Sequence, residues 1–449
     1  MRWTTLVGLW CMAATLVVAA VLWGPSLGIQ QKHTETRRLI ELEGFDLDTI
    51  DDMRLARGDD RWRFRREADG WWQVEPFRHR MHADLLLALP AAAMGTTVVD
   101  AGQPEQEIDR TALGLDPPMA SLMLSGEAGE VGIVLGRRGM AGRAWAARDG
   151  VDGLLVVDPS LHDVILGEHP STWRDLRFFP ELSVDANRLE RTVREETMVL
   201  QRQGRHWRIT SPIETRADDA ATAQHIVELA GVVGEAVLLD HPEDASAFGL
   251  DPPVARVTVS GPDLDRTVLV GDAIAGSGQA RYAMVEGVPS VVRMKPPDVR
   301  RLLGDPMSLV DKSGTDVAAM DVHRIDVQVG ADRVLLERSL DHWVAPAHGG
   351  SVAAAGVVEG LMNVLTTPVA TELMFVDRYP SDLEVAVMTL RGRQGAPLDS
   401  VRILREPLPP DGRGRWAMEN GDRVLRILPE GTHLPLSAEA FGLPIASIQ

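Results

Sequence analysis

A pattern of hydrophobic and polar positions returns three times along this chain of 449 residues. In each copy, alternating runs predict β-strands, of which Trp62–Arg66 is a clear example. The last of these strands carries a tryptophan and ends at a proline, which has no N–H to donate to a sheet. An apolar stretch with helical spacing follows. The tryptophans that we align are Trp72, Trp207 and Trp343. They recur at a nearly constant interval of about 135 residues, and so regular a period predicts an internal repeat of a small domain.

The first copy also carries local signals for the ends of its elements. Leu39–Glu43 alternates and predicts an opening strand. Asp69-Gly70 predicts a hairpin turn, because glycine tolerates the positive φ that such turns need. Asp84 is the expected N-cap of the helix, and Pro90 within that helix predicts a kink or an early stop.

A second landmark is a turn with the sequence Gly-Leu-Asp-Pro-Pro. It occurs within Leu113–Pro118 and again within Phe248–Pro253, and its two glycines are as far apart as Trp72 and Trp207. Glycine supplies an unusual backbone angle there, and we expect the leucine that follows it to enter the core. Gly136 and Gly271 keep the same spacing. The third copy has Tyr379-Pro380 in place of this turn and is the most divergent.

These patterns predict an α+β protein built from repeats. Short connections between alternating strands favour antiparallel pairing, and each copy holds one main apolar helix. We therefore expect an N-terminal transmembrane helix followed by three tandem repeats of a mainly antiparallel β-sheet with one principal helix each. The expected boundaries are an anchor and linker at 1–28, repeat unit 1 at 29–170, repeat unit 2 at 171–310 and a divergent repeat unit 3 at 311–449.

The N-terminal segment is the expected membrane anchor. Leu6–Trp23 is a run of eighteen residues without a charge, which is long enough to cross about 30 Å of hydrocarbon as a helix. Trp3 and Trp23 would lie near the two interfaces. A cleaved signal peptide is the alternative, with Ser26-Leu27-Gly28 as a poor exit site. We expect an uncleaved anchor because of the length of the run and its flanking tryptophans.

The flanking charges leave the orientation of this anchor open. Arg2 precedes the run, while Lys32, Arg37 and Arg38 follow it. The positive-inside rule therefore leans against export of the rest of the chain. We nevertheless expect the large C-terminal part outside the cytoplasm, because a single N-terminal span ahead of a large acidic body usually acts as a signal anchor.

Composition narrows the range of partners. The formal net charge of −19 argues against binding to a nucleic-acid backbone or to an anionic lipid surface, so we predict no nucleic-acid partner. The only cysteine, Cys11, lies in the expected anchor. Neither an intramolecular disulfide nor a thiolate metal site can therefore form.

No pattern of residues in the sequence predicts catalysis. The chain has no His-Glu-x-x-His and no Gly-x-Ser-x-Gly motif. His79 and His82 are three residues apart, and His162 and His169 are seven apart, but none of these histidines recurs in another copy. We predict no catalytic, cofactor-binding or metal-binding residue and no cofactor.

Three features that look like ligand sites have a simpler structural explanation. The repeated tryptophans stand between a turn and a core helix, which favours packing over ligand stacking. The glycine-rich segment Gly136–Gly142 lies between two alternating strands, and we interpret it as a hairpin loop. We assign the paired carboxylates to solvated faces or helix caps: Asp51-Asp52, Glu195-Glu196 and Asp218-Asp219.

The tryptophan strand, an Ala-Asp pair ahead of an apolar helix and the Gly-Leu-Asp-Pro-Pro turn together resemble the bacterial family known as domain of unknown function 4340. The matching stretches are Trp72–Pro76 with Ala83-Asp84, Leu113–Pro118, Trp207–Pro212 with Ala217-Asp218, and Phe248–Pro253. The resemblance covers nearly everything after the anchor and departs from the family pattern at Tyr379-Pro380. It supplies no catalytic residues.

The resemblance implies a protein held in the bacterial inner membrane by one N-terminal helix, with the bulk of the chain periplasmic or otherwise extracytoplasmic. Members are often encoded beside a gliding-motility-type ABC transporter permease and its auxiliary protein. We therefore expect a non-enzymatic scaffold or accessory subunit whose partners are the membrane and the ABC permease or its auxiliary subunit. The alternative is a module that binds a polysaccharide or a peptide in a cleft between units. A remote alternative is a hydrolase with an unrecognised site.

Overall fold

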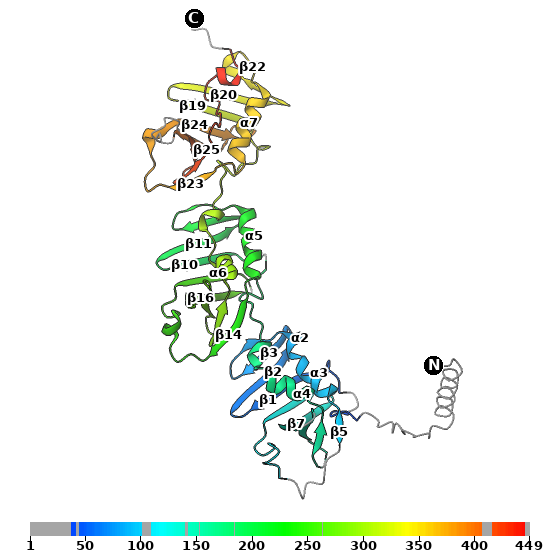
Figure 1. Ribbon diagram of the computed structural model, residues 1–449. Helices are drawn as coiled ribbons and strands as arrows, with labels where there is room; N and C mark the ends of the chain where they lie inside the picture. Colours follow the sequence, from blue (N-terminus) through cyan, green and yellow to red (C-terminus); the bar gives the residue numbers. More distant parts are fainter. Residues whose placement is uncertain are drawn as a thin grey trace, which may run out of the picture. The chain divides into compact units, whose positions relative to one another are not determined.

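Three β-sheets of nine strands each form the framework of the protein in a computed structural model (Figure 1). The structure describes residues 37–41, 45–100, 109–139, 142–151, 153–183, 185–262, 264–405 and 415–444. The chain divides into two compact units, one ending at Asp175 and the other beginning at Leu176. The first unit holds one sheet and the second unit holds two.

The three sheets share one topology, which confirms the tandem repeats of a mainly antiparallel sheet. The strand order of the first sheet is β4-β3-β2-β1-β6-β7-β8-β9-β5. The second sheet, from β13 to β14, and the third sheet, from β22 to β23, repeat this order strand for strand. In each sheet, one edge strand precedes the main helix and the opposite edge strand follows that helix, as β4 and β5 do in the first sheet.

The strands have the following bounds. The first sheet contains β1 (Ile50–Arg57), β2 (Asp60–Glu67), β3 (Gly70–Glu75), β4 (His79–Arg80), β5 (Val98–Asp100), β6 (Ala120–Gly126), β7 (Gly129–Arg138), β8 (Ala144–Arg148) and β9 (Leu155–Val157). The second contains β10 (Arg188–Val193), β11 (Glu196–Gln203), β12 (His206–Ser211), β13 (Thr215–Arg216), β14 (Gly234–Asp240), β15 (Ala255–Ser260), β16 (Asp265–Ala273), β17 (Arg281–Val285) and β18 (Ser290–Met294). The third contains β19 (Arg324–Val329), β20 (Asp332–Ser339), β21 (His342–Ala345), β22 (Ser351–Val352), β23 (Glu372–Phe375), β24 (Glu384–Arg391), β25 (Pro397–Arg405), β26 (Trp416–Glu419) and β27 (Val424–Ile427).

Helices lie against the sheets (Figure 1). The α-helices are α2 (Ala83–Leu86), α3 (Ala88–Gly95), α4 (Ser160–Gly167), α5 (Asp219–Ala230), α6 (Pro296–Leu303) and α7 (Ala355–Thr366). The short 3₁₀ helices are η2 (Pro170–Trp173), η3 (Ala245–Phe248), η4 (Pro306–Leu309), η5 (Pro346–His348), η6 (Ser381–Leu383) and η7 (Glu439–Phe441).

Among the residues that the structure describes, no helix is both long and apolar enough to cross a membrane. The expected anchor at Leu6–Trp23 lies outside those residues.

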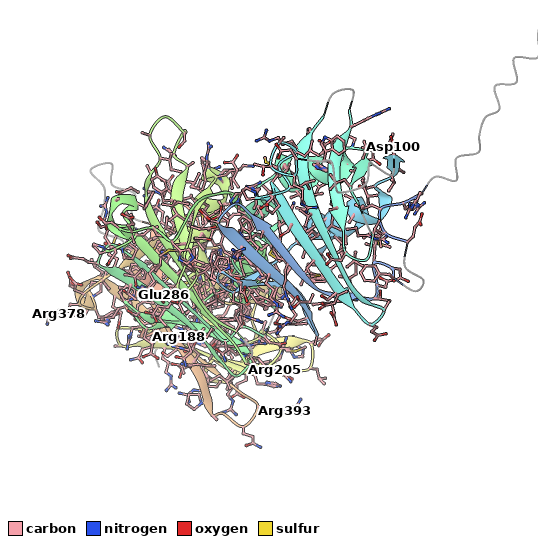
Figure 2. The ribbon with its side chains drawn as sticks, turned by 90° about the horizontal axis from the view of Figure 1, so that it is seen from below. Asp100, Arg188, Arg205, Glu286, Arg378 and Arg393 are labelled. Carbon is pink, nitrogen blue, oxygen red and sulfur yellow. The ribbon has the colours of Figure 1, made fainter. Side chains whose placement is uncertain are left out.

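Each repeat buries one face of its sheet against its helices. In β15, alternate residues Ala255, Val257 and Val259 are buried. Ile226 and Leu229, three positions apart on α5, belong to the same core cluster. The period of two in the strand and the helical period in α5 therefore place their apolar residues on facing surfaces. Charged side chains such as those of Arg378 and Arg393 project from the periphery (Figure 2).

The buried tryptophan of the first repeat is Trp71, so the prediction that chose Trp72 is wrong. Trp71, Trp207 and Trp343 are 4%, 6% and 7% exposed, and each belongs to the core of its repeat. These three core tryptophans follow one another at equal intervals, which we call the repeat interval. Trp72 points to the opposite face of β3, because successive side chains of a strand alternate, and the Arg78 guanidinium covers its ring at 4.0 Å. The predicted core role of Trp207 and Trp343 is confirmed.

The Gly-Leu-Asp-Pro-Pro turns have the backbone that the sequence predicts. Gly114 and Gly249 adopt positive φ angles of 70° and 64°, which a residue with a Cβ rarely adopts. The leucines that follow them, Leu115 and Leu250, are 3% and 2% exposed. Both leucines are buried, but Leu250 joins a small cluster with Leu269 and Val291 that is separate from the main core of its repeat.

Gly136 and Gly271 recur because the turn packs directly onto the strand that carries them. A Cβ on Gly271 would lie 2.1 Å from the carbonyl oxygen of Phe248 in the turn. A Cβ on Gly136 would lie 2.6 Å from the carbonyl oxygen of Leu113. Both distances are far below van der Waals contact, so only glycine fits.

The main helix of the first repeat begins two residues earlier than predicted. Its N-cap is His82, and Asp84 lies in the first turn of α2, so the prediction of Asp84 as the cap is wrong. The residue one repeat interval after His82 is Asp218, whose carboxylate accepts a hydrogen bond from the Ala221 N–H at 2.9 Å. The Ala-Asp pair therefore aligns the two helices two residues out of register.

The break predicted at Pro90 is confirmed. The helix is interrupted at Leu87, between α2 and α3. Pro90 has no N–H for the carbonyl of Leu86, four residues before it, so the helix cannot run on without a fault there.

The opening strand predicted at Leu39–Glu43 does not form in the part of it that the structure describes. Leu39 and Ile40 are buried, yet the only sheet-like pairing nearby is an isolated bridge between Arg38 and Thr97. Leu39 and Ile40 are adjacent in the sequence, and both pack in the core without belonging to a strand. The first strand begins at Ile50.

The first two repeats end by pairing with their own edge strand. Val310 forms an isolated antiparallel bridge with Ala217, and the Asp311 N–H donates to the Arg216 carbonyl at 3.0 Å. In the first repeat, the Asp175 N–H donates to the Arg80 carbonyl at 3.0 Å, and both residues lie one repeat interval earlier. The chain leaving each sheet therefore covers the edge formed by β4 or β13.

The C-terminal Phe441-Gly442-Leu443-Pro444 takes the corresponding place in the third repeat. Phe441 is fully buried, and its carbonyl accepts a hydrogen bond from the Ala354 N–H at 2.9 Å. In the second repeat, the Leu309 carbonyl accepts from the Asp218 N–H at the same distance. The segment that looks like a misplaced turn in the sequence thus closes the core of the last repeat.

Candidate functional site

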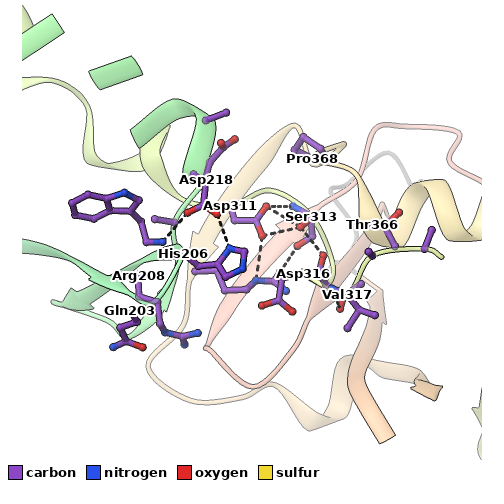
Figure 3. Close-up of a pocket in the computed structure, with 18 residues that line it drawn as sticks. Gln203, His206, Arg208, Asp218, Asp311, Ser313, Asp316, Val317, Thr366 and Pro368 are labelled. Atoms are coloured by element: carbon purple, nitrogen blue, oxygen red, sulfur yellow. Dashed lines mark hydrogen bonds and ion pairs between the residues drawn. The ribbon is translucent and has the colours of Figure 1, made fainter. Parts of the chain in front are cut away.

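Two cavities lie beside the linker that joins the second and third sheets. The first has a volume of about 510 Å³ and is lined by β12, β13 and the start of α5 on one side, and by linker residues and the end of α7 on the other. Figure 3 shows His206 and Asp218 facing Asp311, Ser313 and Asp316 across it. The second cavity has a volume of about 500 Å³ and reaches β25 and the loop before β27.

The two cavities share three lining residues, Arg208, Arg216 and Asp316. We call the two cavities together the inter-repeat cleft. All its lining residues belong to the second compact unit, so its walls come from one body of the chain.

Arg216 is the buried charge of the inter-repeat cleft. It is 6% exposed and belongs to the edge strand β13. Its Nη2 donates to the Ser313 carbonyl at 2.6 Å, and its Nε lies 3.2 Å from Asp311 Oδ2 without hydrogen-bond geometry. Its Nη1 is buried and has no hydrogen-bond partner within the described residues. Burial, and then the charge of nearby Arg426, lower the pKa of Arg216 below its usual value, which marks the electrostatic cost of holding a cation there.

A second buried network ties the third repeat to the second. The fully buried Arg426 of β27 donates to Asp422 Oδ2 at 2.7 Å and to Thr215 Oγ1 of β13 at 3.3 Å. Its Nε donates to the Asp311 carbonyl in the linker at 2.9 Å. Thr215 Oγ1 in turn donates to Asp422 Oδ2 at 2.5 Å. One arginine therefore contacts both repeats and the linker between them.

The carboxylate of this network is held ionised. Burial acts to raise the pKa of Asp422, but the hydrogen bonds and charge of Arg426, together with Thr215, outweigh burial and lower the pKa below its usual value.

The wall formed by α5 is polar but largely paired. Asp218 caps the helix, and Asp219 Oδ1 accepts a hydrogen bond from the Trp207 N–H at 2.7 Å. Asp219 Oδ2 lies 2.7 Å from His206 Nδ1. In the described part of the chain, no serine, threonine or cysteine side chain is hydrogen-bonded to His206, so this pair does not form a nucleophile–base arrangement.

Besides Arg216, Asp316 and Arg208 are accessible to a ligand in the cleft. Asp316 is exposed, and none of the described residues forms a hydrogen bond or ion pair with its carboxylate. Arg208 is half-buried, and its Nη2 is 3.8 Å from Glu214 Oε1, which is too long for a hydrogen bond. The cleft thus offers both donors and acceptors to a polar ligand.

The histidines singled out by their spacing do not converge. His162 is fully buried, its Nε2 lies 3.1 Å from the Trp145 carbonyl, and burial lowers its pKa. His169 caps η2 through the Ser171 N–H, and His79 Nδ1 lies 2.8 Å from the Arg80 carbonyl. Among the described residues, no group of three or more metal-ligating side chains comes together.

The paired carboxylates cap helices or lie in turns, except for Asp52, which is buried. Asp218 accepts a hydrogen bond from the Ala221 N–H and caps α5, which confirms the prediction of a cap, whereas Asp219 accepts from the Trp207 N–H of β12. Asp52 departs from the expected solvated role, because its side chain is only 12% exposed and its Oδ2 lies 2.8 Å from Arg63 Nε. Arginines on β1 and β2 enclose it, a pairing across strands that spacing along the chain does not reveal.

The hairpin predicted at Gly136–Gly142 is confirmed by the antiparallel pairing of β7 with β8. Residues 140 and 141 of that loop lie outside the described part of the chain.

Sequence reasoning missed Arg216, although the repeat carries a signal for it. Arg80 and Arg216 are separated by the repeat interval, as are Asp175 and Asp311. The third repeat has Val352 at the position of Arg216. An arginine present only where another repeat follows marks a junction residue.

The model of the family described as Domain of unknown function (DUF4340) matches residues 207–372, from the tryptophan strand of the second repeat to the edge strand of the third. No curated protein matches the chain. Over residues 207–372, the chain is therefore similar to the DUF4340 family.

Proposed function

We propose that the protein is a non-enzymatic scaffold or accessory subunit anchored in the bacterial inner membrane, with its repeats on the extracytoplasmic side. Leu6–Trp23 supplies the anchor in this proposal. The partner is a membrane protein such as a gliding-motility-type ABC permease or its auxiliary subunit. The family resemblance supports this class of partner. The second and third repeats dock on the partner through their edge strands β14 and β23.

A pair of exposed apolar residues at equivalent edge positions carries the proposal. Leu238 and Leu239 near the end of β14 are 46% and 44% exposed. Met374 and Phe375 at the end of β23 are 45% and 38% exposed, and each lies one repeat interval after its counterpart. Two repeats thus present the same apolar pair, although a solvated edge gains nothing from keeping it.

The place of these pairs in the fold suits docking of another protein. β14 and β23 are the edge strands of their sheets. An exposed strand edge offers unpaired N–H and C=O groups to a partner strand, and apolar side chains on it add buried area. Natural sheets usually protect such an edge with lysine or proline, and neither strand contains either residue.

Co-purification from mild detergent tests the proposal. The full chain is expected to recover a membrane-protein partner. The double variant Leu238→Lys with Leu239→Lys is expected to recover it at least about tenfold less well, because lysine on an edge strand disfavours pairing.

The matched control is Leu340→Lys. Leu340 is 94% exposed at the turn between β20 and β21, so it tests exposure of a large apolar side chain away from a sheet edge. The control is expected to retain the partner. Recovery of the wild-type protein alone, or equal loss in both variants, would contradict the proposal.

A further inference from the structure

We propose that the inter-repeat cleft binds a neutral, polyhydroxylated ligand, a segment of a glycan, between the second and third repeats. This site is independent of the docking edges, because β14 and β23 contribute no residue to either cavity. The proposal therefore stands or falls separately from the scaffold function.

The first reason for proposing a ligand is that Arg216 Nη1 has no hydrogen-bond acceptor among the described residues. The guanidinium lines both cavities, is more than nine-tenths buried, and uses Nη2 but not Nη1 for hydrogen bonding among the described residues. A buried donor without an acceptor costs free energy, and a ligand oxygen in the cleft would remove that cost.

The balance of charge in the cleft defines the chemistry of the ligand. Its two cavities are lined by seven carboxylates and three arginines, so a polyanion would meet net repulsion. Asp316 offers free acceptors, while Arg208 and Arg216 offer donors. A hydroxyl group both donates and accepts, so several hydroxyls on one ring can satisfy such neighbours together.

The structure favours a glycan over an extended peptide. Peptides commonly bind by adding a strand to a free sheet edge or by filling apolar pockets. The edge strand β13 beside the cleft is already covered by linker residues, through the Ala217–Val310 bridge and the bond from the Asp311 N–H to Arg216. In the cavity next to β25, the lining contains one large apolar side chain, that of Leu398.

Glycan-array binding by the full chain, followed by titration of the tightest neutral oligosaccharide, tests the proposal. The double variant Arg208→Gln with Asp316→Asn removes two groups that make no hydrogen bond to other side chains in the described structure, so the fold is expected to persist. The dissociation constant is expected to rise at least about tenfold, the loss from one hydrogen bond to a charged group. Arg216 is left intact because it also joins the linker to β13.

The control is Arg300→Gln, an exposed arginine on α6 that lines neither cavity. It is expected to bind the oligosaccharide as the wild type does, and a thermal melt of each variant checks that it is folded. Failure of every neutral oligosaccharide on the array to bind would overturn the proposal. So would unchanged affinity in the double variant, or binding only to peptides on a parallel peptide array.

Discussion

Adjacent tryptophans in the first repeat show how one residue can change the role of a side chain. Trp71 is buried in the core and Trp72 lies under Arg78 on the other face of the same strand. The sequence predicts one core tryptophan in each repeat, but it does not show which of the two neighbours Trp71 and Trp72 is buried. The choice depends on the register of β3 against β2, and pairing across strands is not encoded in spacing.

Trp207→Ala is expected to destabilise the protein by about 3–5 kcal/mol, because a large aromatic side chain leaves a cavity in a close-packed core. Trp72→Ala is the matched control and is expected to cost about 1 kcal/mol, the value of an exposed cation–π contact. Chemical denaturation of both variants measures the difference. Similar losses for the two variants would contradict the assignment of the core tryptophans.

The pKa of Asp422 predicts an acid-sensitive junction. Its folded pKa is lowered from the ordinary value of 3.8, so the ionised group stabilises the fold. This stabilisation is fully present above the unfolded pKa and is lost as the pH falls through the folded pKa. The melting temperature of Asp422→Asn is therefore expected to lie below that of the wild type at about pH 6 and to approach it as the pH falls through the folded pKa of Asp422. A constant difference over this range would rule out ionisation of Asp422 as the cause.

At the scale of elements, the sequence predicts local conformation better than register. It correctly predicts the repeated strands, the break at Pro90 and the positive φ of Gly114 and Gly249, since each follows from the chemistry of a few neighbouring residues. It misplaces the cap at Asp84, because the Ala83-Asp84 pair looks like Ala217-Asp218, whereas the residue equivalent to Asp218 is His82.

The inter-repeat cleft could not be predicted in the same way. Arg216 of β13 meets Asp311 in the linker, and Thr215 meets Asp422 in the third repeat. These contacts join residues far apart in the sequence and depend on how the third repeat packs on the second, and neither partner carries a local pattern. The sequence suggests a cleft between units only as the alternative to a scaffold function.

The fit of turn against strand predicts an asymmetry between two glycines. Gly271→Ala is expected to cost about 1–3 kcal/mol, because its Cβ would lie 2.1 Å from the Phe248 carbonyl oxygen. Gly360→Ala on the exposed face of α7 meets nothing within 4 Å and is expected to stabilise the protein by up to about 1 kcal/mol. Urea denaturation distinguishes the two signs. A neutral or stabilising effect of Gly271→Ala would show that the turn does not press on β16.

At the scale of the whole molecule, the second and third repeats form one compact unit, while the first repeat forms another. Arg426 contacts the third repeat, the linker and Thr215 of the second repeat. Repeats joined by one buried charge network are expected to open together.

Arg426→Met is expected to cost about 3–5 kcal/mol, because it leaves the buried Asp422 without its charged partner. Hydrogen exchange read by mass spectrometry should speed up in β13 and β27 together and stay unchanged in the first repeat. The exposed Arg378→Met serves as the control (Figure 2). Faster exchange confined to the third repeat would show that the network does not couple the two.

A scaffold function through the edge strands requires that β14 and β23 both face a partner in the membrane. Photo-cross-linking in cells tests this most directly, with p-benzoylphenylalanine placed in turn at Leu239, Phe375 and the exposed Leu340. We expect cross-links from Leu239 and Phe375 to a membrane protein and none from Leu340. The absence of a cross-linked membrane protein at both edges, or equal cross-linking from Leu340, would contradict a docking role for the edge strands.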